Sequence, residues 1–287
     1  MSKTVISLTC SLKQREALYK QLSSQAEVTK PAFSAYQLRL KDCVITAYQS
    51  GKIVFQGSEA PFYAKMVMSV SASSFFPQAG SDEVGTGDYF GPVCVCAAMV
   101  KEAELPLLQK LGVTDSKLIS DVSIRKIAPV LQKELCYSLL IVMPEKYNMV
   151  HAHANMNSVK AQLHNQAYIN LSKKISLPDF KVVDQFTPER QYYSYLHSAA
   201  LVISGLHFET KAESKYPAVA AASVIARNAF LEVMDRMRQQ YGMVFAKGSG
   251  KGADQCAIRF VQSYGFEALN KVAKLHFKNT SRVMNSF

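Results

Sequence analysis

The chain has no tryptophan, no long tail of basic residues and no uninterrupted apolar run that could cross a membrane. A spanning helix needs about 18 or more consecutive apolar residues. The short apolar stretch at the start of the chain is broken by Lys3 and Lys13, so neither a membrane span nor a signal peptide is expected. A basic amphipathic helix with Trp or Phe anchors is lacking too. We therefore predict a cytoplasmic protein that has no membrane partner.

Cysteine is scarce, with six residues in 287 and no C-x-x-C pair. This excludes a disulfide scaffold and agrees with a reducing compartment, and the alternation of Cys94 and Cys96 within an apolar run is typical of buried strand residues. The hydrophobic fraction of 48% and the charged fraction of 19% exclude a disordered chain. The length favours one large domain and a smaller one.

Basic residues outnumber acidic ones by 33 to 22, which gives a net charge of +11. An excess of this size on a folded chain indicates a polyanionic partner, and nucleic acid is the simplest one. The sequence shows neither heptads nor a large exposed apolar stripe, so we expect a monomer.

The serine-rich stretch SVSASSFFPQ at residues 69–78 separates two differently patterned regions. We predict an N-terminal domain over residues 1–72, a linker over 73–79 and a second domain over 80–287. In the first region a helix is expected at 12–22, strands at 35–40, 43–48 and 53–56, and a closing helix at 60–68. This makes a small α+β unit on an antiparallel meander.

The first 73 residues hold nine basic and four acidic residues, so this quarter of the chain carries nearly half of the excess charge. A sheet with helices on one face and basic side chains on the other would suit nucleic acid, but charge alone is equally compatible with a solvated surface.

Beyond the linker, nearly continuous apolar runs at 93–100, 135–143 and 180–183 are typical of strands covered on both faces. Helical patterns lie at 123–133, 147–172 and 218–241. The last has a buried stripe at three- and four-residue steps, formed by Ala226, Phe230, Val233, Met237 and Tyr241. The second domain is therefore expected to be α/β, with a mixed sheet flanked by helices.

Two adjacent acids, Asp82 and Glu83, end a predicted strand and are followed by a Gly-x-Gly turn. Neighbours on a strand point to opposite faces, so both acids can face one ligand only where the chain twists, which glycine permits. Two solvated acids at a strand end are the plain alternative. A dinucleotide-binding fingerprint is excluded because its third glycine falls one residue late, and the loop at 247–252 does not match a P-loop.

Asp184 ends a buried strand, and Glu213 precedes the helix that opens near Pro217. Each acid alone suggests an ion pair or a helix start. Four carboxylates that converge on one site would repel one another strongly unless hard cations neutralise them. Ligands that are all oxygen favour magnesium or manganese over zinc.

The histidines predict no zinc site, since His151 and His153 face different directions on one helix. His151 and His164 are expected at a helix surface or in packing, with a proton-shuttle role left open. A basic C-terminal segment carries Lys271, Lys274, Lys278 and Arg282, which would either line a nucleic-acid groove or form an ordinary helix surface.

Several motifs together resemble the type 2 ribonucleases H. They are the stretch from Gly80 to Pro92, Asp115-Ser116-Lys117, the segment from Asn155 to Asn165, VVDQF at Asp184, and TKAESKYPAVAAASVIAR from Thr210. Glutamate at position 213, where ribonuclease HII has aspartate, and the extra N-terminal unit are similar to the ribonuclease HIII subfamily, which has a TBP-like N-terminal domain.

The resemblance implies a ribonuclease H-like catalytic domain that cleaves the RNA strand of RNA/DNA hybrids internally, leaving 5′-phosphate and 3′-hydroxyl ends. It implies that two divalent cations, Mg²⁺ or Mn²⁺, are held by Asp82, Glu83, Asp184 and Glu213. The substrate contacts that it implies are Gly85, Thr86, Gly87, Ser116, Lys117 and Lys211. Two alternatives stay open: cleavage at single ribonucleotides in DNA, as by ribonuclease HII, and a nucleic-acid-binding protein without catalysis.

Overall fold

The computed structural model describes residues 4–10, 12–64, 76–113 and 119–287. The chain divides into two compact units, Met1–Phe76 and Pro77–Phe287. The first strand of the second unit begins at Gln78.

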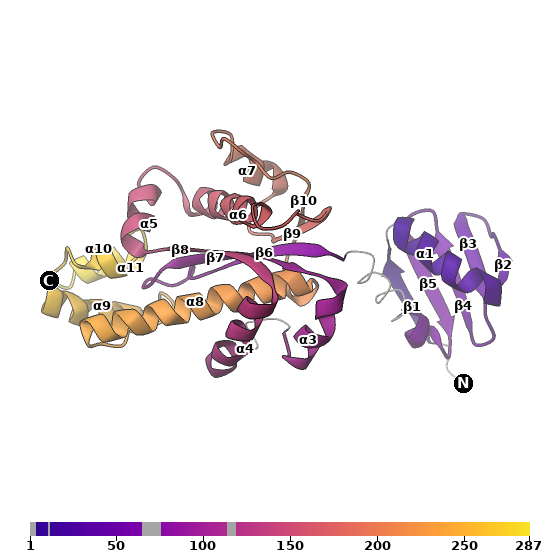
Figure 1. Cartoon of the computed structure of the whole chain (residues 1–287), viewed down its shortest axis with the longest axis horizontal. Coiled ribbons are helices and arrows are strands. Elements are labelled where there is room, and N and C mark those ends of the chain that lie inside the picture. Colours follow the sequence, from indigo (N-terminus) through magenta and orange to yellow (C-terminus); the bar gives the residue numbers. More distant parts are fainter. Residues whose placement is uncertain (1–3, 11, 65–75, 114–118) are drawn as a thin grey trace. The chain divides into compact units, whose positions relative to one another are not determined.

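The N-terminal unit is a five-stranded antiparallel sheet with helix α1 on one face (Figure 1). The sheet has the order β1-β5-β4-β3-β2. The elements are β1 (Val5–Thr9), α1 (Leu12–Leu22), β2 (Glu27–Thr29), β3 (Ser34–Arg39), β4 (Cys43–Tyr48) and β5 (Lys52–Gly57). Residues 60–64 are helical, and the remainder of the predicted closing helix, 65–68, lies outside the described residues.

Helix α1 and the three central strands match the sequence prediction, but the predicted sheet had three strands whereas the observed sheet has five. Strands β1 and β2 add an edge on each side. Alternation explains the core: Leu38, Ile45 and Phe55 are fully buried, while their strand neighbours Gln37 and Gln56 are not. One face of this sheet is therefore packed and the other is open.

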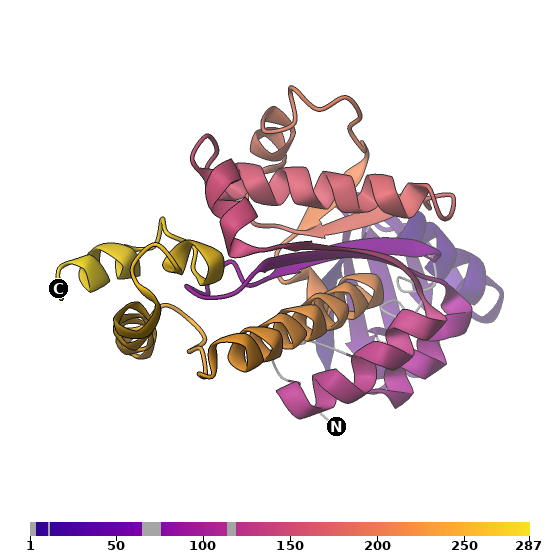
Figure 2. The same cartoon turned by 60° about the vertical axis from the view of Figure 1, so that its left-hand side comes forward.

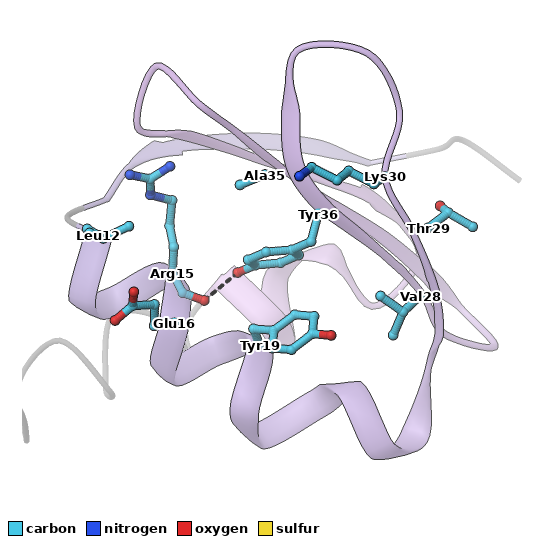
Figure 3. A pocket seen from close by; sticks show the side chains of 9 residues that line it. All are labelled: Leu12, Arg15, Glu16, Tyr19, Val28, Thr29, Lys30, Ala35 and Tyr36. Atoms are coloured by element: carbon cyan, nitrogen blue, oxygen red, sulfur yellow. Dashed lines mark hydrogen bonds between the residues drawn. The ribbon is translucent and has the colours of Figure 1, made fainter.

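A groove of about 520 Å³ lies between α1 and the β2–β3 edge (Figure 3). The Tyr36 hydroxyl closes its base by donating to the carbonyl of Arg15 at 2.6 Å. Tyr19 from the helix and Val28 from the edge strand both line it and are about two-fifths exposed. Helix α1 thus leaves the apolar face of the sheet partly open at this edge.

The second unit is a mixed five-stranded sheet between two helical layers, as predicted (Figure 2). The strand order is β10-β9-β6-β7-β8, with β9 parallel to both neighbours and the other pairs antiparallel. The strands are β6 (Gln78–Val84), β7 (Val93–Val100), β8 (Cys136–Val142), β9 (Phe180–Asp184) and β10 (Leu206–Glu209).

Helix α6 covers one face of this sheet and helix α8 the other, as both views show. The helices are α3 (Leu105–Lys110), α4 (Asp121–Glu134), α5 (Pro144–His151), α6 (Met156–Ser172), α7 (Glu189–Ser194), α8 (Pro217–Tyr241), α9 (Lys251–Tyr264), α10 (Leu269–Val272) and α11 (Lys278–Met284). In the described part of the chain, α8 has the length and apolarity of a membrane span, but 83% of its apolar window is buried, as in a core helix.

The prediction of one long helix over residues 147–172 was wrong, because the chain forms two helices, α5 and α6, with a break between them. Asn155 starts the second helix: its side-chain oxygen accepts a hydrogen bond from the Ser158 N–H at 2.9 Å. Apolar periodicity continues through both helices, so it did not reveal the cap. The new start fixes which side chains of α6 face β6.

Candidate active site

Strand β6 presses against the first turn of α8, and this contact requires Gly80. A Cβ at Gly80 would lie 2.4 Å from the Val219 nitrogen, closer than any real side chain approaches. The close approach brings Ser223 on α8 within hydrogen-bonding reach of the Asp82 carboxyl. The strand therefore delivers its first acid to the α8 side of the sheet.

The Asp82 carboxyl is buried, with 6% of the residue exposed. Burial, followed by the charge of Glu83, raises the pKa of Asp82 to about 8; Asp184 adds to the shift, while the Ser223 hydrogen bond opposes it. The backbone N–H of Glu83 also donates to Asp82 Oδ1, at 2.7 Å. Asp82 thus holds a proton at neutral pH unless a cation compensates its charge.

Glu83 points to the opposite side, toward α6. Its Oε1 accepts from the Lys160 ammonium, and its Oε2 lies 2.7 Å from His164 Nε2. Burial raises the pKa of Glu83, but the His164 hydrogen bond and the nearby His164 and Lys160 charges outweigh burial, so the pKa falls below its ordinary value. The pKa values of these two neighbouring carboxyls are therefore shifted in opposite directions.

Asp184 reaches the same place from the adjacent strand. Pairing of Ser81 with Val183 in the parallel β6–β9 ladder sets Asp184 beside Asp82. Its Oδ1 accepts from the Ala212 N–H at 2.9 Å, which ties the end of β9 to the 3-10 helix Ala212–Ser214. Glu213 in that short helix is 3% exposed.

A cavity of about 440 Å³ opens over these acids. It is lined by Asp82, Glu83, Val84, Gly85, Thr86, Asp184, Ser223 and Arg227. The structure thus joins three of the four predicted acids with part of the predicted Gly85-Thr86-Gly87 loop. Glu213 is buried and directly follows Ala212, whose N–H binds Asp184, but Glu213 does not line the cavity. Gly87 and Lys211 do not line it either. Ser116 and Lys117 lie outside the described residues.

The glycine loop after β6 is held by long-range contacts. Gly85 has a φ of +95°, and a Cβ there would lie 2.1 Å from the Pro92 carbonyl oxygen, so only glycine fits. Asp88 accepts from the Gly248 N–H at 2.6 Å, and Lys274 donates to the Gly91 carbonyl at 2.6 Å. These bonds fix the loop that borders the cavity.

Lys274 corrects our reading of the C-terminal segment. It is fully buried, so it is part neither of a nucleic-acid groove nor of a helix surface. Burial lowers the pKa of its ammonium to about 7. Arg282 is bound to Asp254, with Nε 2.9 Å from Oδ2. Lys274 therefore contradicts the expectation of an exposed cation, whereas Arg282 is paired but remains exposed on α11.

Arg227, which had no predicted role, lines the cavity from α8. Its guanidinium donates to Asp121 at 2.8 Å, and Lys247 from the glycine-rich loop bonds to the other oxygen of the same carboxylate. Burial raises the pKa of Asp121, but the hydrogen bonds from Lys247 and Arg227 outweigh it and bring the pKa below its ordinary value. Arg227 is thus held at the acidic cavity by a carboxylate that Lys247 also binds.

The histidines divide as follows. His151 stacks on His276, with ring centroids 4.1 Å apart, which is a packing role. His164 is fully buried and binds Glu83 directly, a contact that helix periodicity could not reveal. Within residues 4–10, 12–64, 76–113 and 119–287, no three or more His, Cys, Asp or Glu side chains form a ready-made metal site.

Comparisons with known proteins agree with this architecture. The sequence model of the family Ribonuclease HII matches residues 79–280, and a domain of unknown function, DUF3378, matches residues 4–74. Ribonuclease HIII of Streptococcus pneumoniae (strain P1031) is 39% identical over 98% of this chain and 99% of its own, and that of Streptococcus gordonii is 39% identical over 96% of both. The crystal structure of Bst-RNase HIII in complex with Mn²⁺ has a TM-score of 0.75 and 32% identity, covering 99% of each chain.

The raised pKa of Asp82 predicts a pH dependence of stability in the metal-free protein. Because the folded state holds this proton up to about pH 8 and the unfolded chain releases it near 3.8, the stability from protonation is complete below the lower value and is lost as pH rises toward the upper one. The Asn side chain of Asp82→Asn cannot titrate, so the variant does not lose this stability as pH rises. In EDTA, the melting temperature of the variant minus that of the parent should increase by about 3 °C or more from about pH 5 to about pH 8.

The matched control is Asp235→Asn, which removes an acid of the same type from an exposed ion pair with Arg125. Its melting curve should follow the parent chain at every pH. If Asp82→Asn also follows the parent, the carboxyl is not protonated in the fold.

Proposed function

Because the chain belongs to the ribonuclease HII family and, within it, to the ribonucleases HIII, we propose that it cleaves the RNA strand of RNA/DNA hybrids internally by two-metal-ion catalysis, leaving 5′-phosphate and 3′-hydroxyl ends. The observation that carries this proposal is the cavity in which Asp82, Glu83 and Asp184 meet beside a glycine loop. Three carboxylates around one cavity, with Glu213 buried next to the Ala212 that binds Asp184, form a set of oxygen donors that suits divalent cations.

The residues fit hard cations. All the acidic donors are oxygen atoms, and the charges of Glu83 and Asp184 both disfavour ionisation of Asp82, so a nearby cation would relieve an existing repulsion. We assign the ligand set to Asp82, Glu83, Asp184 and Glu213, for Mg²⁺ or Mn²⁺. When bound, two such ions would lower the pKa of the attacking water and neutralise charge on the departing 3′ oxygen.

The chain itself positions the substrate. Gly85 and Thr86 border the cavity, and a glycine backbone allows a ribose to approach closely, so we expect the loop from Gly85 to Gly87 to contact the 2′-hydroxyl that distinguishes RNA from DNA. Arg227, fixed by Asp121, offers a charged donor to a phosphate at the same cavity. We also keep Ser116, Lys117 and Lys211 as phosphate or sugar contacts.

We infer that the N-terminal domain, residues 1–72, binds the hybrid through the open face of its sheet, and that residues 80–287 carry the chemistry. Support comes from the side chains of that face: Arg39, Lys52 and Gln56 are exposed, and Gln37 donates to the Thr46 hydroxyl at 2.9 Å. Amide, hydroxyl and basic groups are those that bind phosphate and sugar oxygens.

We expect a monomer in the cytoplasm, with no membrane partner. Six cysteines without a disulfide, four of the six on the sheets and all at least partly buried, support a reducing compartment. A single folded chain supplies every proposed ligand, so a second copy is not needed to complete the site.

The activity is tested with Asp82→Asn. Cleavage of a hybrid in Mg²⁺ should fall by at least about 100-fold, because the variant lacks one cation ligand, while binding in Ca²⁺ stays within about threefold, because phosphate contacts supply most of the affinity. Asp235→Asn is the matched control and should cleave as the parent does. Equal cleavage by Asp82→Asn would exclude the assigned site, and failure of the parent to cleave would favour a binding protein without catalysis.

The role of the open sheet face is tested with Arg39→Ala combined with Lys52→Ala. Hybrid binding should weaken, and the slope of log K against log salt should decrease by about 1 for each phosphate that the variant no longer neutralises. Lys20→Ala, on α1 rather than on the open face, should leave both unchanged. An unchanged slope in the double variant would show that this face does not bind the phosphates of the hybrid.

Substrate choice is tested by comparing two duplexes at equal concentration. One contains a single ribonucleotide embedded in DNA, and the other is a hybrid with several consecutive ribonucleotides. We expect cleavage of the hybrid to be faster by at least about tenfold, since the proposed sheet contacts extend beyond the scissile residue. Preferred cleavage of the embedded ribonucleotide would favour the HII-like alternative.

A further inference from the structure

Both oxygens of the Glu83 carboxylate are already bound within the protein. The Lys160 ammonium bonds to Oε1, and His164 Nε2 lies 2.7 Å from Oε2. The other ring nitrogen of His164 lies 2.7 Å from the Ser81 hydroxyl. With a hydrogen on Nε2 the ring donates to Glu83, and the Ser81 hydroxyl is the hydrogen-bond partner of the other ring nitrogen. Helix α6 thus clamps Glu83 on the face of β6 opposite to Asp82.

The ammonium of Lys160 is enclosed. The residue is 8% exposed, and its Nζ lies 3.9 Å from the centre of the Phe186 ring, which also stacks on His164. A buried lysine is rare in proteins unless it is paired. Its partner here is an acid that we assign to cation binding, and Phe186 follows Asp184 by only two residues. The cation is therefore built into the acidic site.

The same carboxylate cannot keep the lysine on Oε1 and the histidine on Oε2 while also turning both oxygens toward Asp82. Neighbouring strand residues face opposite sides, so alternation turns Glu83 toward α6, where Lys160 and His164 hold its carboxylate.

We propose that Lys160 is an internal counter-ion of the acidic site, which binds Glu83 when metal is absent and competes with a divalent cation for that carboxylate. The inference rests on the proposed metal site. The lysine stabilises the empty site by compensating one of its negative charges, and by the same interaction it weakens metal binding. Lys160 is thus a positioning residue that sets the metal concentration at which the site fills.

Removing the charge should act in two opposite directions. Lys160→Met keeps the length and the apolar stem but leaves Glu83 without its cation. We expect the metal-free variant to melt at a lower temperature than the parent and to bind Mn²⁺ at least about tenfold more tightly, because one repelling positive charge is gone from the site. A merely structural role would lower the affinity for Mn²⁺ together with the stability.

Two further variants sharpen the test. Lys160→Arg keeps the positive charge and should bind Mn²⁺ within about threefold of the parent. Lys173→Met makes the same substitution at an exposed position at the end of the same helix, and should change neither Mn²⁺ affinity nor the melting temperature of the metal-free protein. Affinity is measured by calorimetry or from the electron paramagnetic resonance of free Mn²⁺, so no reading depends on cleavage.

Should Lys160→Met not fold, the parent chain gives a second reading. The side-chain ammonium signal of Lys160, observed by NMR in ¹⁵N-labelled protein, should move on addition of Mg²⁺ as Glu83 leaves it, whereas the Lys174 signal stays in place. An unmoved Lys160 signal at saturating Mg²⁺, or Mn²⁺ binding by Lys160→Met that is equal to or weaker than the parent's, overturns the competition. No Mn²⁺ binding by the parent itself would instead overturn the proposed metal site.

Discussion

The main constraint on this structure is the repulsion between carboxylates that lie close together and away from water. Asp82, Glu83 and Asp184 lie around one cavity, and the fold leaves them little solvent for screening. The protein reduces this repulsion in a different way at each of two neighbouring positions. Asp82 has a hydroxyl and a backbone N–H as hydrogen-bond donors and a pKa raised to about 8, whereas Glu83 has a lysine, a histidine and a lowered pKa. Environments that drive two adjacent acids apart in pKa are characteristic of functional sites.

The rest of the second unit serves to hold these acids in place. The parallel pairing of β6 with β9 brings Asp184 level with Asp82, which are about a hundred residues apart in the sequence. Gly80 lets α8 approach the sheet closely enough for Ser223 to bind Asp82. Helix α6 supplies the compensating cation from the other face. Each layer of this unit therefore contributes at least one interaction to the same few carboxylates.

Sequence reasoning recovered most of the architecture because burial leaves a regular trace. The apolar run of β7 was predicted to the residue, and so was α1, while α4, β8, β9 and α8 were placed within a few residues. Strand β2 was missed because three residues cannot show alternation. The break before Asn155 was missed because a single capping hydrogen bond decides it.

The site was predictable only in part, and for a physical reason. Asp82 and Glu83 stood out because a glycine turn follows them, but the direction in which each side chain points depends on partners far away in the sequence. The bond from Lys160 to Glu83 joins α6 to β6, and nothing in the local pattern of Lys160 distinguishes it from a solvated helix lysine. Arg227 and Asp121 are likewise paired across 106 positions. Family resemblance named the acids but assigned no role to these cations.

The bond from Lys274 to Gly91 has a consequence for biosynthesis. It joins groups 183 residues apart in the sequence, and the same lysine also donates through its backbone to Tyr89. Closing so long a segment is entropically slow, and during translation it cannot happen before residue 274 has emerged from the ribosome. The turn beside Asp82 and Glu83 is therefore among the last parts of the fold to be fixed in place, after nearly the whole chain has been synthesised.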